Sequence, residues 1–311
     1  MEQLRLSPEL RLLGKSDLRV SPIAWGMWRF AGSDVAAAQA RCEAALSAGI
    51  NFFDTADIYG PDNDEPFGAS EALLGRVFAA SPTMRDRIVL ASKGGIRIGV
   101  PYDSSPAYLR AAVEASLTRL GVDRIDLWQV HRPDMLTHPG EVAATLDALV
   151  TEGKIGAVGV SNHTPAQTGA LARHLKAPLV STQPEFSPLA TAPLFDGTLD
   201  RAMKHGLGVL GWSPLGQGRL GDGDPRPGRR VADDARTARV KAALRDHGAR
   251  FDVGVAATAY AWIMAHPAGV IPIIGSQDVG RIAQSADAFK VHFTRAEWYA
   301  ILTASLGENL P

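Results

Sequence analysis

The stretch NFFDTADIYG, residues 51–60, contains a short apolar strand pattern followed by an aspartate and a tyrosine, and it is the most informative segment for the fold. Its apolar run ends in Asp54, and Tyr59 lies five residues beyond. The run IVLASKGG likewise ends in Lys93, and IDLWQVHRPD ends its run in His131. In a barrel of parallel strands, the carboxyl ends of the strands and the loops after them share one face. We therefore expect these four side chains to lie together on that face.

Eight short apolar or β-branched runs alternate with amphipathic stretches, which is typical of parallel βα units. The predicted strands are 22–25, 51–53, 88–91, 127–130, 157–160, 179–182, 209–212 and 271–274. The predicted helices among them are 35–48, 70–79, 106–120, 141–152 and 165–174. Eight such units predict an α/β fold, a single (β/α)8 TIM barrel that forms one domain over residues 1–311.

Three segments depart from the simple repeat. Residues 4–20 precede the first strand and predict a small hairpin that closes the bottom of the barrel. Residues 216–230 are rich in Gly, Pro and Asp, which predicts a loop inserted above the barrel. Residues 278–305 carry two further helical patterns, so we expect extra helices at the C-terminal end.

The composition excludes several classes of function. The 32 basic and 33 acidic residues give a net charge of -1, which offers no footprint for nucleic acid or an anionic membrane. Cys42 is the single cysteine, no secretory segment precedes the first strand, and no apolar run approaches the roughly 20 residues of a membrane helix. We expect a cytoplasmic protein, monomeric or weakly associated, whose partner is a small molecule.

The motifs FFDTADIYG, ASKGG, GVDRIDLWQVHRPD, GAVGVSNHT, GVLGWSPLGQG and IPIIGSQDVGRI follow one another in this order. In these motifs, over nearly its whole length, the chain resembles the aldo-keto reductases. The ending RAEWYAILTASLGENLP is similar to a bacterial, YdhF-like subgroup of that family. The resemblance implies an NADPH-dependent oxidoreductase, of the carbonyl reductase or alcohol dehydrogenase type, that reduces aldehydes and ketones. It also implies that Asp54, Tyr59, Lys93 and His131 are the catalytic tetrad.

The tetrad makes chemical sense as a proton donor with its supports. A phenol whose pKa is near ~10 is a poor acid at neutral pH, so Tyr59 needs a cationic neighbour to lower its pKa. Lys93 is that cation, and Asp54 would pair with Lys93 and keep it charged. A neutral His131 would hydrogen-bond the carbonyl oxygen of the substrate.

The resemblance also assigns a cofactor site. Ser161, Asn162 and Gln183 would hold the nicotinamide carboxamide, and Trp212 would stack on the ring. Small residues and Arg219 in the seventh loop would approach the pyrophosphate. Gly275 and Ser276 would open a helix that carries Arg281 to the 2′-phosphate. The full predicted set is Gly26, Met27, Ser161, Asn162, Gln183, Trp212, Ser213, Pro214, Leu215, Gly216, Gln217, Gly218, Arg219, Ile274, Gly275, Ser276, Arg281, Gln284 and Ser285.

Two positions depart from the pattern of the family. Gln277 stands where a basic residue often follows the serine, and Gln284-Ser285 stand where Glu-Asn often meets the adenine. Preference for NADPH then depends on Ser276 and Arg281, and some use of NADH is plausible. No GxGxxG motif follows the first strand, so the dinucleotide would lie on the barrel itself.

Trp28, Tyr102 and Phe186 are the residues predicted to line a substrate pocket, with rim packing as the alternative for the last two. No metal is assigned, because the histidines lack the spacing of metal ligands. Two other functions stay open. One is a sensor that keeps the cofactor but turns over slowly. The other is a Schiff-base lyase that uses Lys93, although a charged Lys93 beside Asp54 argues against it.

Overall fold

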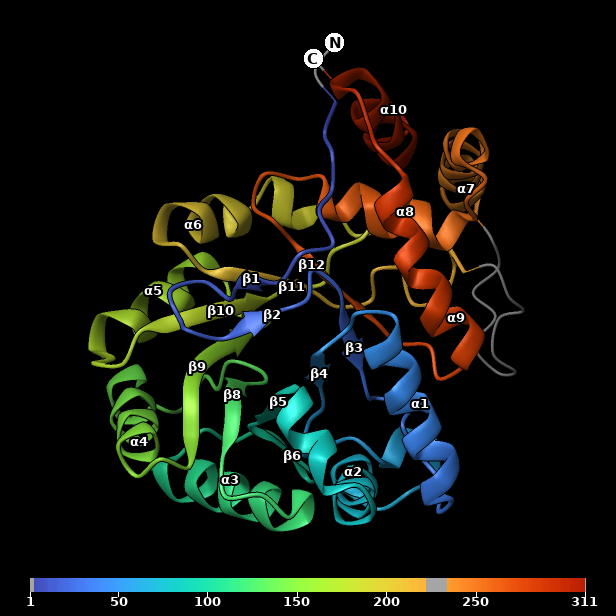
Figure 1. Cartoon of the computed structure of the whole chain (residues 1–311). Coiled ribbons are helices and arrows are strands. Elements are labelled where there is room, and N and C mark those ends of the chain that lie inside the picture. Colours follow the sequence, from blue (N-terminus) through green and yellow to red (C-terminus); the bar gives the residue numbers. More distant parts are fainter. Residues whose placement is uncertain (1–2, 222–233, 311) are drawn as a thin grey trace.

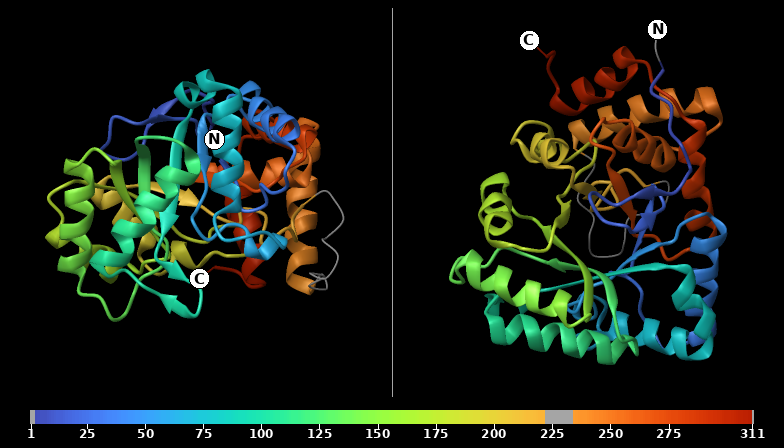
Figure 2. Two further views of the ribbon diagram at one scale, coloured as in Figure 1. Left: turned by 90° about the horizontal axis from the view of Figure 1, so that it is seen from below. Right: turned by 60° about the vertical axis from the view of Figure 1, so that its left-hand side comes forward.

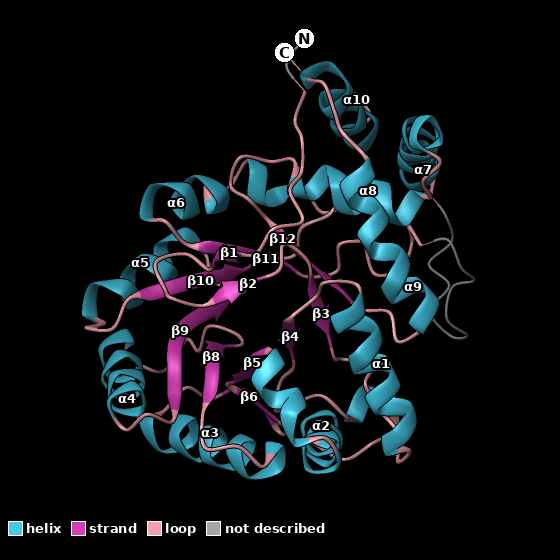
Figure 3. Cartoon of the chain, in the orientation of Figure 1, coloured by secondary structure: helices cyan, strands magenta, loops and turns pink. Residues whose placement is uncertain are grey.

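A closed barrel of eight parallel strands forms the centre of the computed structural model, which describes residues 3–221 and 234–310. Figure 1 shows helices packed around the outside of these strands, and Figure 3 separates the two kinds of element by colour. Around the barrel the strands run in the order β3, β4, β5, β8, β9, β10, β11 and β12, and β12 pairs with β3 to close it. The predicted fold class is confirmed.

The barrel strands agree with the prediction to within three residues at each end. They are β3 (Ala24–Gly26), β4 (Phe52–Asp54), β5 (Val89–Gly94), β8 (Ile125–Val130), β9 (Ile155–Ser161), β10 (Leu179–Gln183), β11 (Gly208–Gly211) and β12 (Ile271–Ile274). Several strands extend further toward their carboxyl ends than predicted, because the prediction ended each strand where its apolar run ended. Near the site, a residue that faces the barrel interior can be polar and still belong to the strand.

The helices follow local signals in the sequence. They are α1 (Val35–Ser47), α2 (Ala69–Ala80), α3 (Pro106–Leu120), α4 (Pro139–Thr151), α5 (Pro165–His174), α6 (Thr198–His205), α7 (Ala235–Gly248), α8 (Val255–Met264), α9 (Val279–Gln284) and α10 (Arg295–Leu306). Ser105 caps α3 through the Tyr108 amide, and Thr164 begins α5 with a full capping box. Both helices therefore begin where the Ser-Pro and Thr-Pro pairs predict.

The N-terminal hairpin consists of β1 (Arg11–Leu12) and β2 (Arg19–Val20), which pair antiparallel. Leu13 is fully buried among the side chains that fill the barrel interior. The turn at Gly14 approaches so closely that a Cβ there would lie 2.1 Å from the Val180 carbonyl oxygen. Since β10 and β11 begin beside this turn, the hairpin closes the bottom of the barrel, opposite the strand ends that carry the predicted site.

The connection from β11 to β12 is the longest. Residues 222–233 lie outside the described part of the chain, and most of the predicted loop 216–230 falls there. The helix α7, which no sequence pattern predicted, packs beside α10 (Figure 1). Arg236 donates from Nε to the Ser305 carbonyl oxygen over 2.8 Å, so this arginine caps the end of α10. Figure 2 shows α10 and the start of the chain at the same end of the molecule, where Leu4 donates to Phe293.

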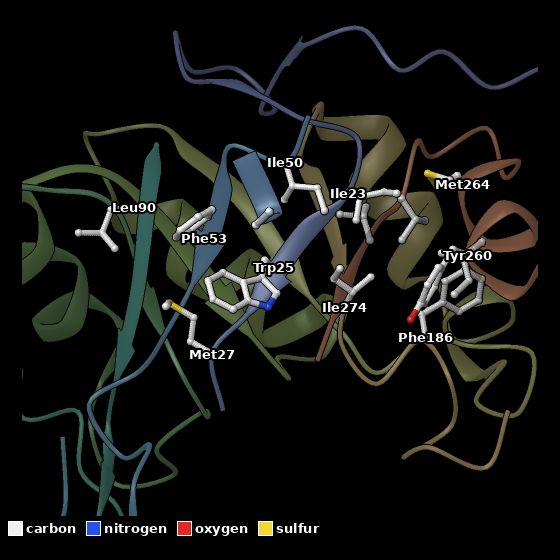
Figure 4. Packing of buried hydrophobic residues seen from close by; sticks show 14 of the residues in the cluster. Ile23, Trp25, Met27, Ile50, Phe53, Leu90, Phe186, Tyr260, Met264 and Ile274 are labelled. Carbon is white, nitrogen blue, oxygen red and sulfur yellow. The ribbon is translucent and has the colours of Figure 1, made fainter. Parts of the chain in front are cut away.

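Two hydrophobic layers follow from the alternation of side chains along each strand. Ala24 and Phe52 point inward and fill the barrel, whereas Trp25 and Phe53 point outward to the helices. The Trp25 and Phe53 rings pack edge to face with centroids 5.0 Å apart. Figure 4 shows both side chains in the core. The same alternation continues to the end of β4, where the inward position is Asp54.

Candidate active site

The barrel interior changes from apolar to polar near the carboxyl ends of its strands. Five buried polar side chains occupy inward positions there, two to four residues beyond the apolar layer on the same strands: Asp54, Lys93, Gln129, Ser161 and Gln183. Lys93 and Gln129 are direct partners in the pairing of β5 with β8, and Ser161 and Gln183 are partners in that of β9 with β10. Strand register therefore brings together residues that are far apart in the sequence.

A buried ion pair stands at the centre of this layer. Lys93 Nζ lies 2.5 Å from Asp54 Oδ2, and it also donates to the Thr55 carbonyl oxygen over 2.8 Å. Burial by itself would lower the pKa of Lys93, but the charge of Asp54, together with Tyr59, outweighs it and raises the pKa above its ordinary value. Lys93 is consequently held in its charged form.

Two glutamines hold the other oxygen of the carboxylate. Gln129 Nε2 and Gln183 Nε2 each donate to Asp54 Oδ1 over 3.1 Å, and Gln183 Nε2 also donates to Gln129 Oε1. The sequence prediction missed Gln129 and assigned Gln183 to the cofactor. The structure places the Gln183 amide nitrogen against Asp54, so only its oxygen is left to meet a bound group.

Tyr59 lies in the loop after β4, partly exposed, with its ring beside Lys93. Lys93 Nζ is 5.0 Å from the ring centroid. Burial of the hydroxyl raises the pKa of Tyr59, and the positive charge and hydrogen bonding of Lys93 act in the opposite direction. The sequence prediction named the effect of Lys93 correctly but not the net direction, because desolvation of the phenolate is the larger cause.

His131 follows β8 and faces Tyr59, with ring centroids 6.0 Å apart. Its ring is almost fully buried, and its Nδ1 has no hydrogen-bond partner among residues 3–221 and 234–310. Burial lowers the pKa of His131 well below the usual range, and the charges of Lys93 and Arg132 add to this. A neutral imidazole with an unused ring nitrogen therefore lies next to Tyr59.

A chain of polar contacts links the ends of β9, β10 and β11. Ser161 Oγ donates to the Gln183 carbonyl oxygen, and Asn162 Nδ2 donates to Ser161 Oγ and to the His131 carbonyl oxygen. Trp212 Nε1 donates to Asn162 Oδ1 over 2.9 Å. Asn162 has a φ of 59°, a left-handed conformation that asparagine adopts more readily than most residues. Its amide nitrogen is fully engaged, whereas Oδ1 keeps one lone pair for a bound amide.

The indole of Trp212 is half-buried, and the guanidinium carbon of Arg132 lies 5.8 Å from its ring centroid. In the loop that follows, backbone hydrogen bonds form tight turns: the Gly216 amide donates to the Ser213 carbonyl oxygen, and the Gly218 amide donates to the Leu215 carbonyl oxygen. The predicted pyrophosphate cation, Arg219, donates from Nε to the Gly216 carbonyl oxygen over 3.0 Å. The predicted residues 212–219 thus form one compact turn in which Pro214 is buried and Gln217 and Gly218 are exposed.

The end of β12 differs from the sequence prediction at the helix. The helix α9 begins at Val279, not at Gly275-Ser276, and Asp278 caps it by accepting from the Arg281 amide over 2.9 Å. A carboxylate thus already occupies the positive end of α9, which disfavours a second anion there. The Arg281 side chain is exposed and forms no ion pair within the described ranges.

Gln277 turns toward the barrel. Its Nε2 donates to the Gly26 carbonyl oxygen over 3.1 Å, and its Oε1 is buried without a partner among the described residues. Gly26 itself is needed for close packing, because a Cβ there would lie 2.7 Å from the Ile273 side chain. Ser276 Oγ accepts from the Asp278 amide. Gln284 is exposed, whereas Ser285 is buried and donates to its own helix.

Three predicted residues belong to the core. Phe186 lies in the hydrophobic core (Figure 4) and has no exposed surface, so it does not line a substrate pocket. Its ring centroid is 5.8 Å from that of Trp262. Met27 and Ile274 are also buried in the same cluster, and Met27 uses its backbone to bind Asp54 and Ser70. These positions look like site residues in sequence because they adjoin strand ends, but their side chains point to the helices.

Two aromatic residues stay at the rim. Trp28 is half-buried and donates from Nε1 to Asp62 Oδ2 over 2.9 Å. Tyr102 is exposed on the hairpin of β6 (Ile96–Arg97) and β7 (Val100–Tyr102), which follows the Lys93 strand. Within the described residues no cluster of His, Cys, Asp or Glu could hold a metal ion, and no helix there is long and apolar enough to cross a membrane.

This barrel, with a buried Asp–Lys pair beside a tyrosine and a neutral histidine, belongs to the aldo/keto reductase family, whose family model matches residues 22–305. The chain is 52% identical to the 6-dehydroglucose reductase of Novosphingobium aromaticivorans, with full coverage of both chains. It is 35% identical, also with full coverage, to the 6-dehydroglucose reductase of Agrobacterium fabrum. The oxidoreductase YdhF of Escherichia coli is 31% identical, over 94% of this chain and 95% of YdhF.

Proposed function

We propose that this oxidoreductase reduces the aldehyde group of a polyhydroxylated, sugar-like substrate such as 6-dehydroglucose, with NADPH as the preferred cofactor and Tyr59 as the proton donor. The observation that carries the proposal is the convergence of Tyr59 and a neutral His131 on the buried Asp54–Lys93 pair. The substrate class is supported by the two 6-dehydroglucose reductases that align along their whole length.

The charges of the tetrad suit a carbonyl reduction. A reduced nicotinamide held by Asn162, Gln183 and Trp212 would supply the hydride for the carbonyl carbon. As negative charge grows on the carbonyl oxygen, Tyr59 donates its proton to that oxygen, and Lys93 stabilises the phenolate that remains. His131, which is neutral, donates a hydrogen bond to the same oxygen and fixes its direction. Asp54 keeps Lys93 charged through each of these changes.

The residues present fit a nicotinamide dinucleotide. The amide oxygens of Asn162 and Gln183 can accept from a carboxamide, because the nitrogens of both groups are already bound within the protein. Trp212 offers an indole face beside them, and Arg281 offers a cation for the 2′-phosphate. One cation without a basic residue at 277 supports a modest preference for NADPH over NADH.

The raised pKa of Lys93 counts against a Schiff-base lyase, because an amine must lose its proton before it attacks a carbonyl. The test is a panel of aldehydes at equal concentration, with loss of NADPH or NADH absorbance as the readout. We expect the highest kcat/KM for polyhydroxylated aldehydes, with 6-dehydroglucose included. A simple alkyl aldehyde of the same length is the matched control. No turnover of any aldehyde with either cofactor would overturn the reductase and favour a cofactor-binding sensor.

A further inference from the structure

A second polar cluster lies behind the active site, on the helix-facing side of β5. Ser92 and Gly94 flank Lys93 in this strand and point away from the barrel interior. Ser92 Oγ donates to Glu71 Oε1 over 2.5 Å, and Arg119 pairs with Glu71 through Nη2 at 2.7 Å and Nε at 2.8 Å. Glu71 has no exposed surface, so this is a buried ion pair between α2 and α3.

Asp57 belongs to the same cluster. Its carboxyl and the Trp128 ring both lie close to Gly94, because a Cβ on Gly94 would be 2.9 Å from Asp57 Oδ2 and 2.7 Å from Trp128 Cζ2. The Asp57 amide donates to the Lys93 carbonyl oxygen over 2.9 Å, so the backbone of Asp57 is bound directly to β5. Asp57 is fully buried, and neither carboxyl oxygen has a hydrogen-bond partner within residues 3–221 and 234–310.

The charges of this cluster do not balance if Asp57 is ionised. The ionisable groups that face it are Tyr59 on its own loop, Glu71 on α2, Tyr108 and Arg119 on α3, and Lys93 on β5. Arg119 already forms an ion pair with Glu71, and Lys93 already forms one with Asp54. A buried carboxylate without a cation is far more costly than a buried neutral carboxylic acid.

The direction of the Asp57 pKa shift agrees with the lack of a cation to pair with its carboxylate. Burial raises the pKa of Asp57 well above its ordinary value, and the charge of Glu71 raises it further. Arg119, the Ile58 amide and Lys93 act in the opposite direction but do not outweigh these causes; the Ile58 amide is near the carboxyl but falls short of hydrogen-bond geometry.

We propose that Asp57 is a positioning residue whose carboxyl group stays neutral in the working enzyme, so that Lys93 faces a single carboxylate, Asp54, and remains beside Tyr59. The inference rests on the proton-transfer roles given to Tyr59 and Lys93 under Proposed function. An ionised Asp57 would attract Lys93 from behind and would make Tyr59 a weaker acid, because a nearby negative charge disfavours the phenolate. The neutral state therefore protects the proton donor from a second buried charge.

The protonation state of Asp57 can be measured without turnover. Infrared difference spectra between the wild type and D57N at pH 7 should contain the carbonyl stretch of a neutral carboxylic acid. D123N, which changes an exposed aspartate before β8, is the matched control and should show carboxylate bands only. On a Glu71→Gln background Arg119 is free to pair with Asp57, so the neutral-acid band should disappear. Carboxylate bands alone in the D57N difference would overturn the proposal, whatever the substrate of the enzyme.

The positioning role is tested by the pH profile of kcat/KM for an aldehyde that the enzyme reduces. In the wild type, Asp57 ionises at high pH, and its negative charge then raises the pKa of Tyr59, so that Tyr59 keeps its proton to a higher pH. In D57N this charge never forms, so the fall of kcat/KM that follows deprotonation of Tyr59 should move downward by about one pH unit, the scale on which one nearby charge acts, whereas D123N should follow the wild type. Superimposable profiles for D57N and the wild type would refute the positioning role. A neutral-acid band without turnover of any aldehyde would count against the proposed function instead.

Discussion

Asp54→Asn is the change that most directly tests the buried ion pair. The asparagine has the shape of Asp54 but carries a donor on one side. Its NH2 group must face either Lys93 Nζ or the Nε2 atoms of Gln129 and Gln183, all of which are donors. Breaking a buried pair of this kind costs about 3–5 kcal/mol of stability. Lys93 can limit the loss by releasing its proton, which at pH 7 costs about 4.6 kcal/mol for an ordinary lysine.

The way in which stability changes with pH distinguishes a charged Lys93 in the wild type from a neutral Lys93 in Asp54→Asn. In the wild type the pKa of Lys93 is raised, so its contribution is fully present below the unfolded pKa, near ~10.4, and is lost as pH rises through the higher folded value. In Asp54→Asn the buried Lys93 is neutral while the unfolded chain still binds a proton. The stability of the variant should therefore rise by about 1.4 kcal/mol per pH unit between pH 7 and the unfolded pKa.

Urea denaturation of both proteins from pH 7 to pH 9.5 measures this slope. Asp86→Asn, at an exposed position, is the matched control and should follow the wild type at each pH. Turnover of Asp54→Asn should fall by at least ~100-fold, because a neutral Lys93 no longer favours the phenolate of Tyr59. A loss below about 1 kcal/mol, or a stability gap that does not change with pH, would refute the pairing as the source of the Lys93 charge.

Three other changes test separate parts of the molecule. Tyr59→Phe should keep NADPH affinity in a fluorescence titration and lower kcat by at least ~100-fold; near-normal turnover would place the proton donor elsewhere. Arg281→Ala should weaken NADPH roughly ten- to a hundredfold and leave the Kd of NADH unchanged, and equal losses would mean that Arg281 supports the fold. The pKa of Glu297 is lowered to about 2: burial alone would raise it, but the Thr294 cap and Arg250 outweigh that. Glu297→Gln should therefore cost about 1 kcal/mol at pH 7, after allowance for screening. This cost should vanish as pH falls from ~4.5 to ~2, and a gap that persists at low pH would contradict the pairing.

Much of the site could be predicted from the sequence because strand geometry is local. Alternation along FFD and ASK places Asp54 and Lys93 on the inward face, and the (β/α)8 repeat brings their strands side by side. Gln129 was missed, although the same rule could have found it: in IDLWQV it shares the inward parity of Leu127, and a polar residue there needs a partner.

Other parts could not be predicted, because they depend on contacts between distant segments. Gln277 binds the Gly26 carbonyl oxygen across a separation of 251 residues, and no local pattern reveals which way its amide turns. The cap at Asp278 moved the start of α9 away from the predicted phosphate site, since a helix begins where a side chain can satisfy its first amides. The net direction of the Tyr59 pKa was also beyond the sequence, because it depends on how much water the folded chain removes.

The site contains few charges, and this is what makes its chemistry directional. In the interior layer one cation, Lys93, faces one carboxylate, Asp54, while Gln129 and Gln183 supply neutral donors. His131 is held neutral by burial, so it can donate to an oxygen without adding a second cation beside Lys93. Charge that develops on a substrate oxygen then meets donors that are already oriented, and a fixed donor needs no reorganisation at the moment of transfer. An additional buried charge on either side of β5 would shift the pKa values of Lys93 and Tyr59. A neutral His131 on the site side of β5 and a neutral Asp57 on its helix-facing side therefore have the same effect: neither adds a charge beside Lys93 and Tyr59.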